Sequence, residues 1–321
     1  MPSALWNSRS ELAKFSRRRG CPFRGQEWLT IDKIVLSYLF LSAMKFQLGC
    51  ELDYDLSSES IFIFNIRAME NEYQHILNQS LEINPNCQQE EYVDREGRNS
   101  YFRLVAPEGK LTISYKATVE LKHYAHNTNE IEQISVDRVP LDVIPYLYPS
   151  RYCQSDRLMK LAQDEFGNCR PGYAKVKAVC DWIYHKISYT SGSTDSHTSA
   201  FDTATERAGV CRDFAHLGIA FCRALGIPAR FISAYAWQLD PPDFHACFEA
   251  YLGDRWYLFD ATRLAPTNGL VRIGTGRDAA DTAFATVFGA VSLNNMDVYI
   301  KNIDNRSSEL ESNTAYANIS T

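Results

Sequence analysis

Three side chains in the second half of the sequence, Cys211, His245 and Asp260, could together carry out acyl transfer. In such chemistry a thiolate attacks a carbonyl carbon and an imidazole takes and returns the proton, while a carboxylate orients the imidazole and stabilises its charged form. Each residue alone has a plainer interpretation, because a helical cysteine is usually a small buried apolar residue and a strand histidine usually has a structural partner. The catalytic interpretation therefore depends on whether the chain brings the three together.

Cys211 stands near the start of a predicted helix. The helical pattern runs from about Gly209 to Leu225 and stops at Gly226, with Pro228 beyond, which is typical of a helix C-terminus. At a helix start the backbone N–H groups have no intrahelical partner and form the positive end of the helix dipole. These groups favour a thiolate, and they can also stabilise the oxyanion of an acyl-transfer intermediate.

His245 and Asp260 are predicted to lie on one hairpin. Residues 252–255, Leu-Gly-Asp-Arg, form a turn signal between two strand-like segments. If the two ends of this turn pair with each other, Cys247 faces Asp260, and His245 projects from the same side of the sheet. The Cα atoms of His245 and Asp260 would then be roughly 7–8 Å apart, close enough for an imidazole–carboxylate hydrogen bond.

A zinc site is the main alternative use of these side chains. Its ligands would come from Cys211, His216, Cys222, His245 and Cys247, but the paired, close-spaced ligands of structural zinc are absent from the sequence. His216 is also about 140° round the helix axis from Cys211. We therefore expect no metal and, because the sequence has neither a dinucleotide-binding glycine fingerprint nor a phosphate loop, no cofactor.

The elements around these residues predict an α+β core over residues 150–300, in which a helix bundle packs on an antiparallel sheet. Within it, Arg230 and Glu249 are expected to form a structural salt bridge. The predicted helices cover 155–162, 175–187 and 209–225, and the predicted strands cover 231–237, 244–251 and 256–260.

Residues 44–145 predict a separate N-terminal antiparallel β-sandwich. Alternating apolar residues, rich in β-branched and aromatic types, recur in short segments separated by polar turns, without a long helical period. Three prolines at 140, 145 and 149 then mark a linker to the core. The predicted strands include 46–54, 60–66 and 111–121.

The two ends of the chain resemble neither domain in composition. Residues 1–33 have a net charge of +4, and the apolar run 34–44 that follows has 11 residues, whereas a membrane-spanning helix needs about 20. We interpret residues 1–43 as a disordered or non-native leader before a start at Met44, or alternatively as the targeting leader of an exported protein. Residues 301–321 are interpreted as a polar C-terminal tail.

The overall composition excludes several classes of protein. With 45% hydrophobic and 22% charged residues in a chain of 321, the protein is neither wholly disordered nor a collagen-like or coiled-coil rod. A net charge of −6 gives no electrostatic footprint for nucleic acid. Nine cysteines, an odd number at low density, indicate free thiols in a reducing compartment. We expect a cytoplasmic protein without a membrane span.

The sequence around the three candidate residues resembles that of the transglutaminase-like superfamily of papain-fold cysteine enzymes. The resemblance covers roughly residues 150–290, and the strand-rich region from Met44 resembles the N-terminal β-domain of the bacterial members. Two positions depart from the family pattern, since Cys247 stands where a Trp is usual and Ala261 where a Pro is usual. The matching blocks are Gly209–Leu217, Leu225–Arg230, Asp243–Tyr251 and Trp256–Thr262.

The resemblance implies that Cys211, His245 and Asp260 form a catalytic triad that acts on an amide of a peptide or protein. The superfamily includes proteases, transglutaminases, peptide N-glycanases and members of unknown activity, so the motifs specify the site better than the reaction. Hydrolysis is the expected reaction because water needs no second binding site. The alternatives are transfer of the acyl group to an amine, and a non-catalytic binding module that retains the fold.

Overall fold

The computed structural model describes residues 39–40, 43–94, 97–122, 124–304 and 314–318. The described residues from Phe40 onward belong to one compact unit. The predicted leader, 1–43, lies almost wholly outside the described residues, as does much of the predicted tail, 301–321. Within the described part of the chain, no helix is long and apolar enough to cross a membrane.

Two antiparallel four-stranded sheets form the predicted β-sandwich. One sheet has the order β15–β3–β6–β5 and the other β16–β2–β7–β4. Alternate side chains of the long strands face inward, so Leu48, Leu52 and Ile113 are fully buried, as the period of two in a strand requires. The strands are β2 (Met44–Leu56), β3 (Ser60–Phe64), β4 (Gln74–Asn84), β5 (Gln89–Val93), β6 (Ser100–Ala106), β7 (Gly109–Leu121), β15 (Ala285–Phe288) and β16 (Val291–Asn302).

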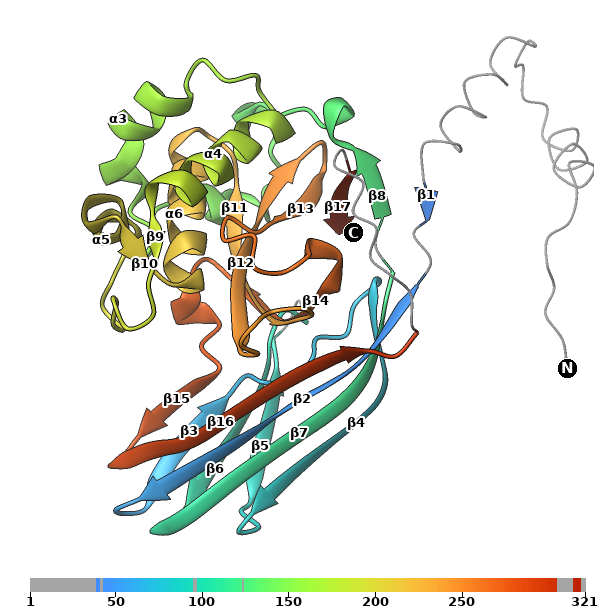
Figure 1. The fold of residues 1–321 in the computed structure, drawn as a ribbon, viewed down its shortest axis with the longest axis vertical. Helices are drawn as coiled ribbons and strands as arrows, with labels where there is room; N and C mark the ends of the chain where they lie inside the picture. The colour runs from blue at the N-terminus through green and yellow to red at the C-terminus, as the bar shows by residue number, and fades with distance from the viewer. Residues whose placement is uncertain (1–38, 41–42, 95–96, 123, 305–313, 319–321) are drawn as a thin grey trace, which may run out of the picture. The chain divides into compact units, whose positions relative to one another are not determined.

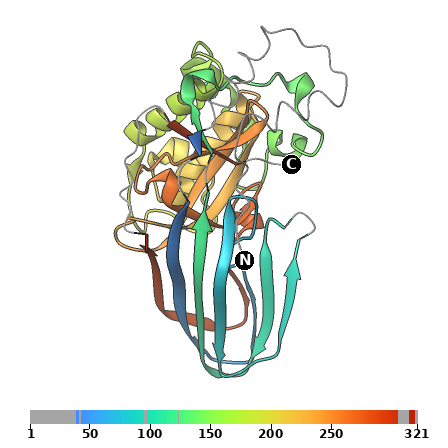
Figure 2. The ribbon, with the colours of Figure 1, turned by 90° about the vertical axis from the view of Figure 1, so that its right-hand side faces the viewer.

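The chain returns to the sandwich after completing the core. β15 pairs with β3 and β16 pairs with β2 over most of its length, so the late strand lies beside the early one (Figure 2). The sequence analysis assigns residues 150–300 to the core domain, whereas β15 and β16 belong to the sandwich sheets. Most side chains of β16 are exposed or half-buried, so its apolar alternation is weak, and its partner strand lies more than two hundred residues earlier in the chain.

The second half of the unit has the predicted α+β architecture. Helix α6 packs on β11 and β12, and α3, α4 and α5 pack on α6 (Figure 1). Gly218 of α6 allows close contact with the sheet, because a Cβ there would lie 2.5 Å from Cε1 of Phe248. The helices are α3 (Ser155–Phe166), α4 (Tyr173–Lys186), α5 (Ala200–Glu206) and α6 (Cys211–Ala224), with short 3₁₀ turns at Thr128–Glu130, Val136–Arg138, Ile144–Leu147, Thr267–Gly269 and Ala279–Asp281.

The core sheet places its hairpin strands at the centre. Six of its strands follow the order β8–β17–β13–β12–β11–β14, and each neighbouring pair among them is antiparallel. A separate parallel pair, β9 with β10, precedes α6. The strands are β1 (Leu39–Phe40), β8 (Tyr124–Asn127), β9 (Ser188–Tyr189), β10 (Ala208–Gly209), β11 (Ala229–Ala236), β12 (Phe244–Leu252), β13 (Arg255–Phe259), β14 (Leu270–Gly276) and β17 (Thr314–Asn318).

Polar groups connect the sandwich to the core sheet. The side-chain amide of Gln74 donates to the carbonyl of Arg272 at 2.8 Å and accepts from its N–H at 2.7 Å. The hydroxyl of Tyr235 donates to the carbonyl of Ile66 at 2.7 Å. Each of these groups is buried and has a hydrogen-bond partner. The sandwich and the core sheet are therefore in direct contact here, without a layer of solvent between them.

The predicted salt bridge between Arg230 and Glu249 is confirmed and has a third member. Glu249 is fully buried, and its carboxylate accepts from Arg230 Nε and from a guanidinium nitrogen of Arg272, each at 2.7 Å. Burial raises the pKa of the Glu249 carboxyl, but the two guanidinium groups outweigh that effect and lower the pKa below its usual value. The carboxylate therefore stays charged inside the sheet.

Candidate active site

Cys211 is the first residue of α6, close to the predicted helix start. The carboxylate of Asp213 fixes the turn before it, since Oδ2 accepts the backbone N–H of Val210 at 2.9 Å and the hydroxyl of Thr194 at 2.7 Å. Gly209 is required beside this turn, because a Cβ there would lie 2.8 Å from Cβ of Asp213. The Cys211 side chain is half-buried, so the thiol is presented at a fixed helix end while it remains partly accessible.

His245 lies at the start of β12 and is held by the predicted hairpin. The register expected from the turn at 252–255 is confirmed, and it continues to the pair formed by Phe248 and Phe259. His245 Nε2 and Asp260 Oδ2 are 3.0 Å apart, and both side chains are almost fully buried. The imidazole–carboxylate contact inferred from the turn is therefore present in the structure.

Asp260, one residue beyond β13, has both carboxylate oxygens engaged. While Oδ2 faces His245, Oδ1 accepts the backbone N–H of Thr262 at 2.9 Å and its hydroxyl at 2.7 Å. Burial raises the pKa of Asp260, but the charge of His245 and these hydrogen bonds outweigh it and lower the pKa. The role of Thr262 was not apparent from the sequence, although an Asp followed by Thr at the second position is a common local turn.

The Cys211 side chain lies close enough to the His245 imidazole to raise its pKa. Because Nε2 faces Asp260, Nδ1 is the nitrogen left for the thiol. Burial lowers the pKa of His245, but the charge and hydrogen bond of Asp260, followed by the nearby Cys211 side chain, raise it well above its usual range. The structure thus brings together the three residues singled out in the sequence, in an arrangement that favours the charged imidazole.

The other cysteines and histidines considered for a metal site have different surroundings. Cys222 and Cys247 are buried, and burial raises the pKa of each thiol above its usual range. His216 stacks on the ring of Tyr152 and accepts the backbone N–H of Ala279 at 3.1 Å. Among the residues that the structure describes, no three His, Cys, Asp or Glu side chains are grouped closely enough to hold a metal ion.

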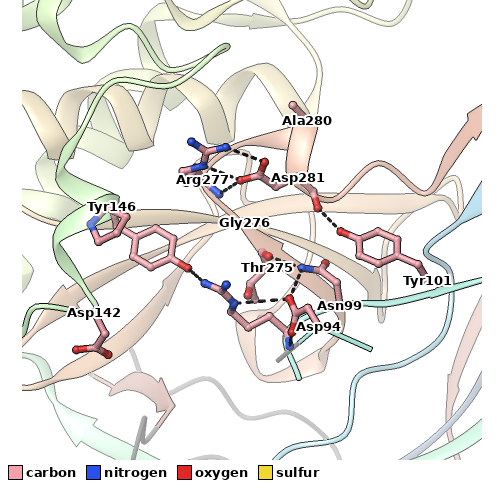
Figure 3. A pocket seen from close by; sticks show the side chains of 12 residues that line it. Asp94, Asn99, Tyr101, Asp142, Tyr146, Thr275, Gly276, Arg277, Ala280 and Asp281 are labelled. Carbon is pink, nitrogen blue, oxygen red and sulfur yellow. Dashed lines mark hydrogen bonds and ion pairs between the residues drawn. The ribbon is translucent and has the colours of Figure 1, made fainter. Parts of the chain in front are cut away.

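A hollow of about 620 Å³ has none of the three candidate residues in its lining (Figure 3). It is lined from the sandwich, the linker and the end of β14, and its charged groups contact one another, as Arg277 contacts Asp281. Its residue Gly276 is opposite Phe231 on β11, whereas His245 is opposite Ala234. Phe231 and Ala234 are about 10 Å apart along β11, so this hollow is separate from the candidate catalytic residues.

A smaller hollow of about 280 Å³ borders Asp260. Tyr173, Lys177 and Asp181 of α4 line it together with Arg263. Lys177 Nζ lies 2.9 Å from a carboxylate oxygen of Asp181, which Arg263 also contacts. These ion pairs therefore line the same hollow as Asp260.

Comparison with known proteins agrees with this arrangement in both halves of the chain. Residues 159–261 match the transglutaminase-like superfamily, and residues 44–142 match the bacterial transglutaminase N-terminal domain. A solved structure of a proposed cysteine protease from Cytophaga hutchinsonii has 50% sequence identity and a TM-score of 0.84, and the match covers 87% of this chain and 99% of that one.

Two mycobacterial relatives extend the comparison. An uncharacterised protein of Mycobacterium leprae is 27% identical over 247 residues, which is 72% of this chain and 87% of the relative. An uncharacterised protein of Mycobacterium tuberculosis H37Rv is 31% identical over 142 residues, or 40% of this chain and 45% of the relative. The high identity over nearly all of the Cytophaga protein and the two family matches confirm the resemblance seen in the sequence. This chain belongs to the transglutaminase-like superfamily.

Proposed function

We propose that the protein is a cysteine-dependent acyl-transfer enzyme that hydrolyses an amide bond in a peptide or protein. The observation that carries the proposal is the 3.0 Å contact between the His245 imidazole and Asp260, with the Cys211 side chain near enough to the same imidazole to raise its pKa. A partly accessible thiol at a helix N-terminus, beside an imidazole that a buried carboxylate holds, is the arrangement that activates a cysteine nucleophile. The proposed protease activity of the 50%-identical Cytophaga relative supports the same reading.

The proposed reaction has two halves. In the first, the Cys211 thiolate attacks the carbonyl carbon, the oxygen becomes an oxyanion near the N–H of Cys211, and the C–N bond breaks as the His245 imidazolium protonates the leaving amine. In the second, neutral His245 takes a proton from water, which attacks the acyl-enzyme and releases Cys211. Asp260 keeps the imidazole oriented and stabilises its charge throughout. An oxyanion donor contributes about 3–4 kcal/mol to such a reaction.

Hydrolysis is favoured over amine transfer because water needs no second binding site. The test is a library of peptides and simple amides, assayed with the wild-type chain and Cys211→Ala, each with and without a primary amine. Hydrolysis that requires Cys211 is the expected result. Covalent incorporation of the amine in preference to water would assign a transglutaminase instead.

A non-catalytic module is the outcome that would contradict the enzyme altogether. Alkylation by iodoacetamide separates this case, because an activated Cys211 reacts well below pH 8 and loses that reactivity in His245→Ala, whereas an ordinary thiol does neither. The absence of both turnover and enhanced alkylation in a folded protein would leave only the fold in common with the superfamily's enzymes.

A further inference from the structure

The two sheets of the sandwich have different outer faces. On the sheet that contains β2 and β7, the outward positions are mainly polar, as in the facing pairs Asp53 with Thr112 and Glu51 with Ser114. On the sheet with the order β15–β3–β6–β5, apolar and aromatic side chains point outward instead. An exposed apolar patch of this kind marks an interaction surface. Its members are Ile61, Ile63, Tyr92, Tyr101, Val105 and Phe288.

The strand register joins these side chains into one continuous patch. Phe288 on β15 is opposite Ile61 on β3, which is in turn opposite Val105 on β6. Two rows along the sheet, Tyr101 on β6 is opposite Tyr92 on β5. Because directly opposite residues project from the same face of a sheet, the patch extends from one edge strand to the other. We call it the outer apolar face.

The outer apolar face has a hollow at one edge and a protruding ring at the other. Phe288 is 59% exposed on the edge strand β15. Three strand spacings, about 14 Å, separate β15 from β5, where the hollow lies. A two-fold rotation would therefore place the Phe288 ring of each copy over the hollow of the other, so the face is complementary to itself. The hollow has a volume of about 440 Å³ and is lined by Ile63, Glu90, Glu91, Tyr92, Tyr101 and Arg103.

The charged groups around the hollow are neutralised in pairs. Arg103 contacts Glu90, and Arg67 lies 2.6 Å from Glu91. The chain as a whole has a net charge of −6, so two copies repel each other on average, but a face with balanced charge adds nothing to that repulsion. The same balance leaves no excess of basic groups on this face to attract a nucleic acid or an anionic membrane. A second copy of the chain, with the same neutral face, fits it best.

We propose that the outer apolar face is the two-fold interface of a homodimer. Ile61 and Ile63 of β3, between the ring and the hollow, lie near the rotation axis, and each Phe288 enters the opposite hollow. The sheet face measures roughly 19 by 23 Å. Two copies then bury on the order of 1,000 Å² in total, at the lower end of specific interfaces, so the dimer should form at micromolar concentrations. The proposal does not depend on the reaction assigned to Cys211, because the face belongs to the sandwich.

Sedimentation velocity of the full chain, from roughly 1 to 300 μM so as to bracket the micromolar range, tests the dimer. We expect a monomer at the lowest concentration and a species of twice the mass at the highest. Phe288→Ala removes both inserted rings and should raise the dissociation constant by at least about 30-fold. Leu77→Ala is the matched control, because Leu77 is 52% exposed on β4 in the other sheet. It should leave the dissociation constant unchanged.

A mixture of two defective variants tests whether the insertion is reciprocal. Glu90→Trp places a ring over the hollow but keeps Phe288, and it breaks only an exposed ion pair of little value to stability. Alone, it should weaken the dimer as Phe288→Ala does. In a mixed dimer the Phe288 ring of one variant meets the open hollow of the other, so the equimolar mixture should associate about 10-fold more tightly than either variant alone. A mixture without this gain would contradict reciprocal insertion.

Each contrary result overturns the proposal in a recognisable way. A full chain that stays monomeric throughout the range would assign the face to a different occupant. A dimer that Phe288→Ala leaves intact is held by another surface, and growth to ever larger species indicates a head-to-tail contact that does not close. Thermal unfolding verifies the fold of each variant, and unchanged iodoacetamide alkylation of Cys211 in Phe288→Ala separates the interface from the proposed function.

Discussion

The sandwich and the core are both built on antiparallel sheets, but they bury different kinds of groups. The sandwich interior is aromatic and aliphatic, with Phe64 between Phe62 and Phe102 at centroid distances of 5.3 and 5.2 Å. The core sheet buries charge, with His245 against Asp260 and the Glu249 carboxylate between two arginines. Burying a charged group costs free energy unless the group is paired. We therefore expect the catalytic site in the sheet that holds these buried charge pairs.

The largest effect should follow from weakening the charge pair in the core. In Asp260→Asn the neutral amide no longer stabilises the imidazolium, and we expect turnover to fall by about 10⁴-fold while the protein stays folded. Turnover of the best substrate from the amide library, with thermal unfolding as the control, measures this. Wild-type turnover in a folded Asp260→Asn protein would remove Asp260 from the mechanism.

The Asp260→Asn substitution should also change how turnover depends on pH. The pKa of His245 is raised in the folded protein, so the imidazolium that protonates the leaving amine persists above about pH 6.5, the ordinary histidine value, and is lost only as pH rises through the raised pKa. Without the carboxylate charge that pKa falls. The basic limb of the pH–rate profile should therefore move to lower pH in Asp260→Asn, and an unmoved limb would show that Asp260 does not set the imidazole's charge.

A substitution that creates a cavity in the sandwich should lower the stability of the protein without changing the reactivity of Cys211. Phe64 is fully buried in the aromatic stack, and Phe64→Ala is expected to lower the free energy of unfolding by about 3–5 kcal/mol. Urea denaturation measures the loss, and iodoacetamide alkylation of Cys211, measured well below the unfolding transition, should match wild type. A large change in alkylation would mean that the two regions are less separate than their interiors indicate.

A smaller effect is expected where the helix meets the core sheet. In Gly218→Ala the added Cβ would overlap the Phe248 ring, with 2.5 Å to the nearest ring carbon, and overpacking of this kind costs about 1–3 kcal/mol. Thermal unfolding measures the loss. An unchanged stability would show that α6 can lift from the sheet without cost.

The sequence predicted the parts of the site that are encoded locally. The helix start at Cys211 and the hairpin that carries His245 each depend on neighbouring residues, such as Gly226 at the helix end and the turn at 252–255, and both were predicted correctly. The contact between these two elements required the tertiary fold, which the family resemblance suggested and spacing alone did not.

The missed features are those in which the partners are far apart in the chain. Arg272 joins the Glu249 pair from another strand, and Gln74 pairs with the backbone of Arg272 although the two residues are 198 positions apart. Register within a hairpin can be counted, whereas register between distant segments depends on the whole fold.

The late strands β15 and β16 have a consequence for how the protein can be divided. Because they complete the two sandwich sheets from the far side of the core sequence, the sandwich is a discontinuous domain, and the core is inserted between its early and late strands. If the chain were divided once after residue 142, each sandwich sheet would lose one strand. β15 and β16 would remain attached to the core without their partner strands. An exchange of sandwiches between relatives would have to transplant both segments together.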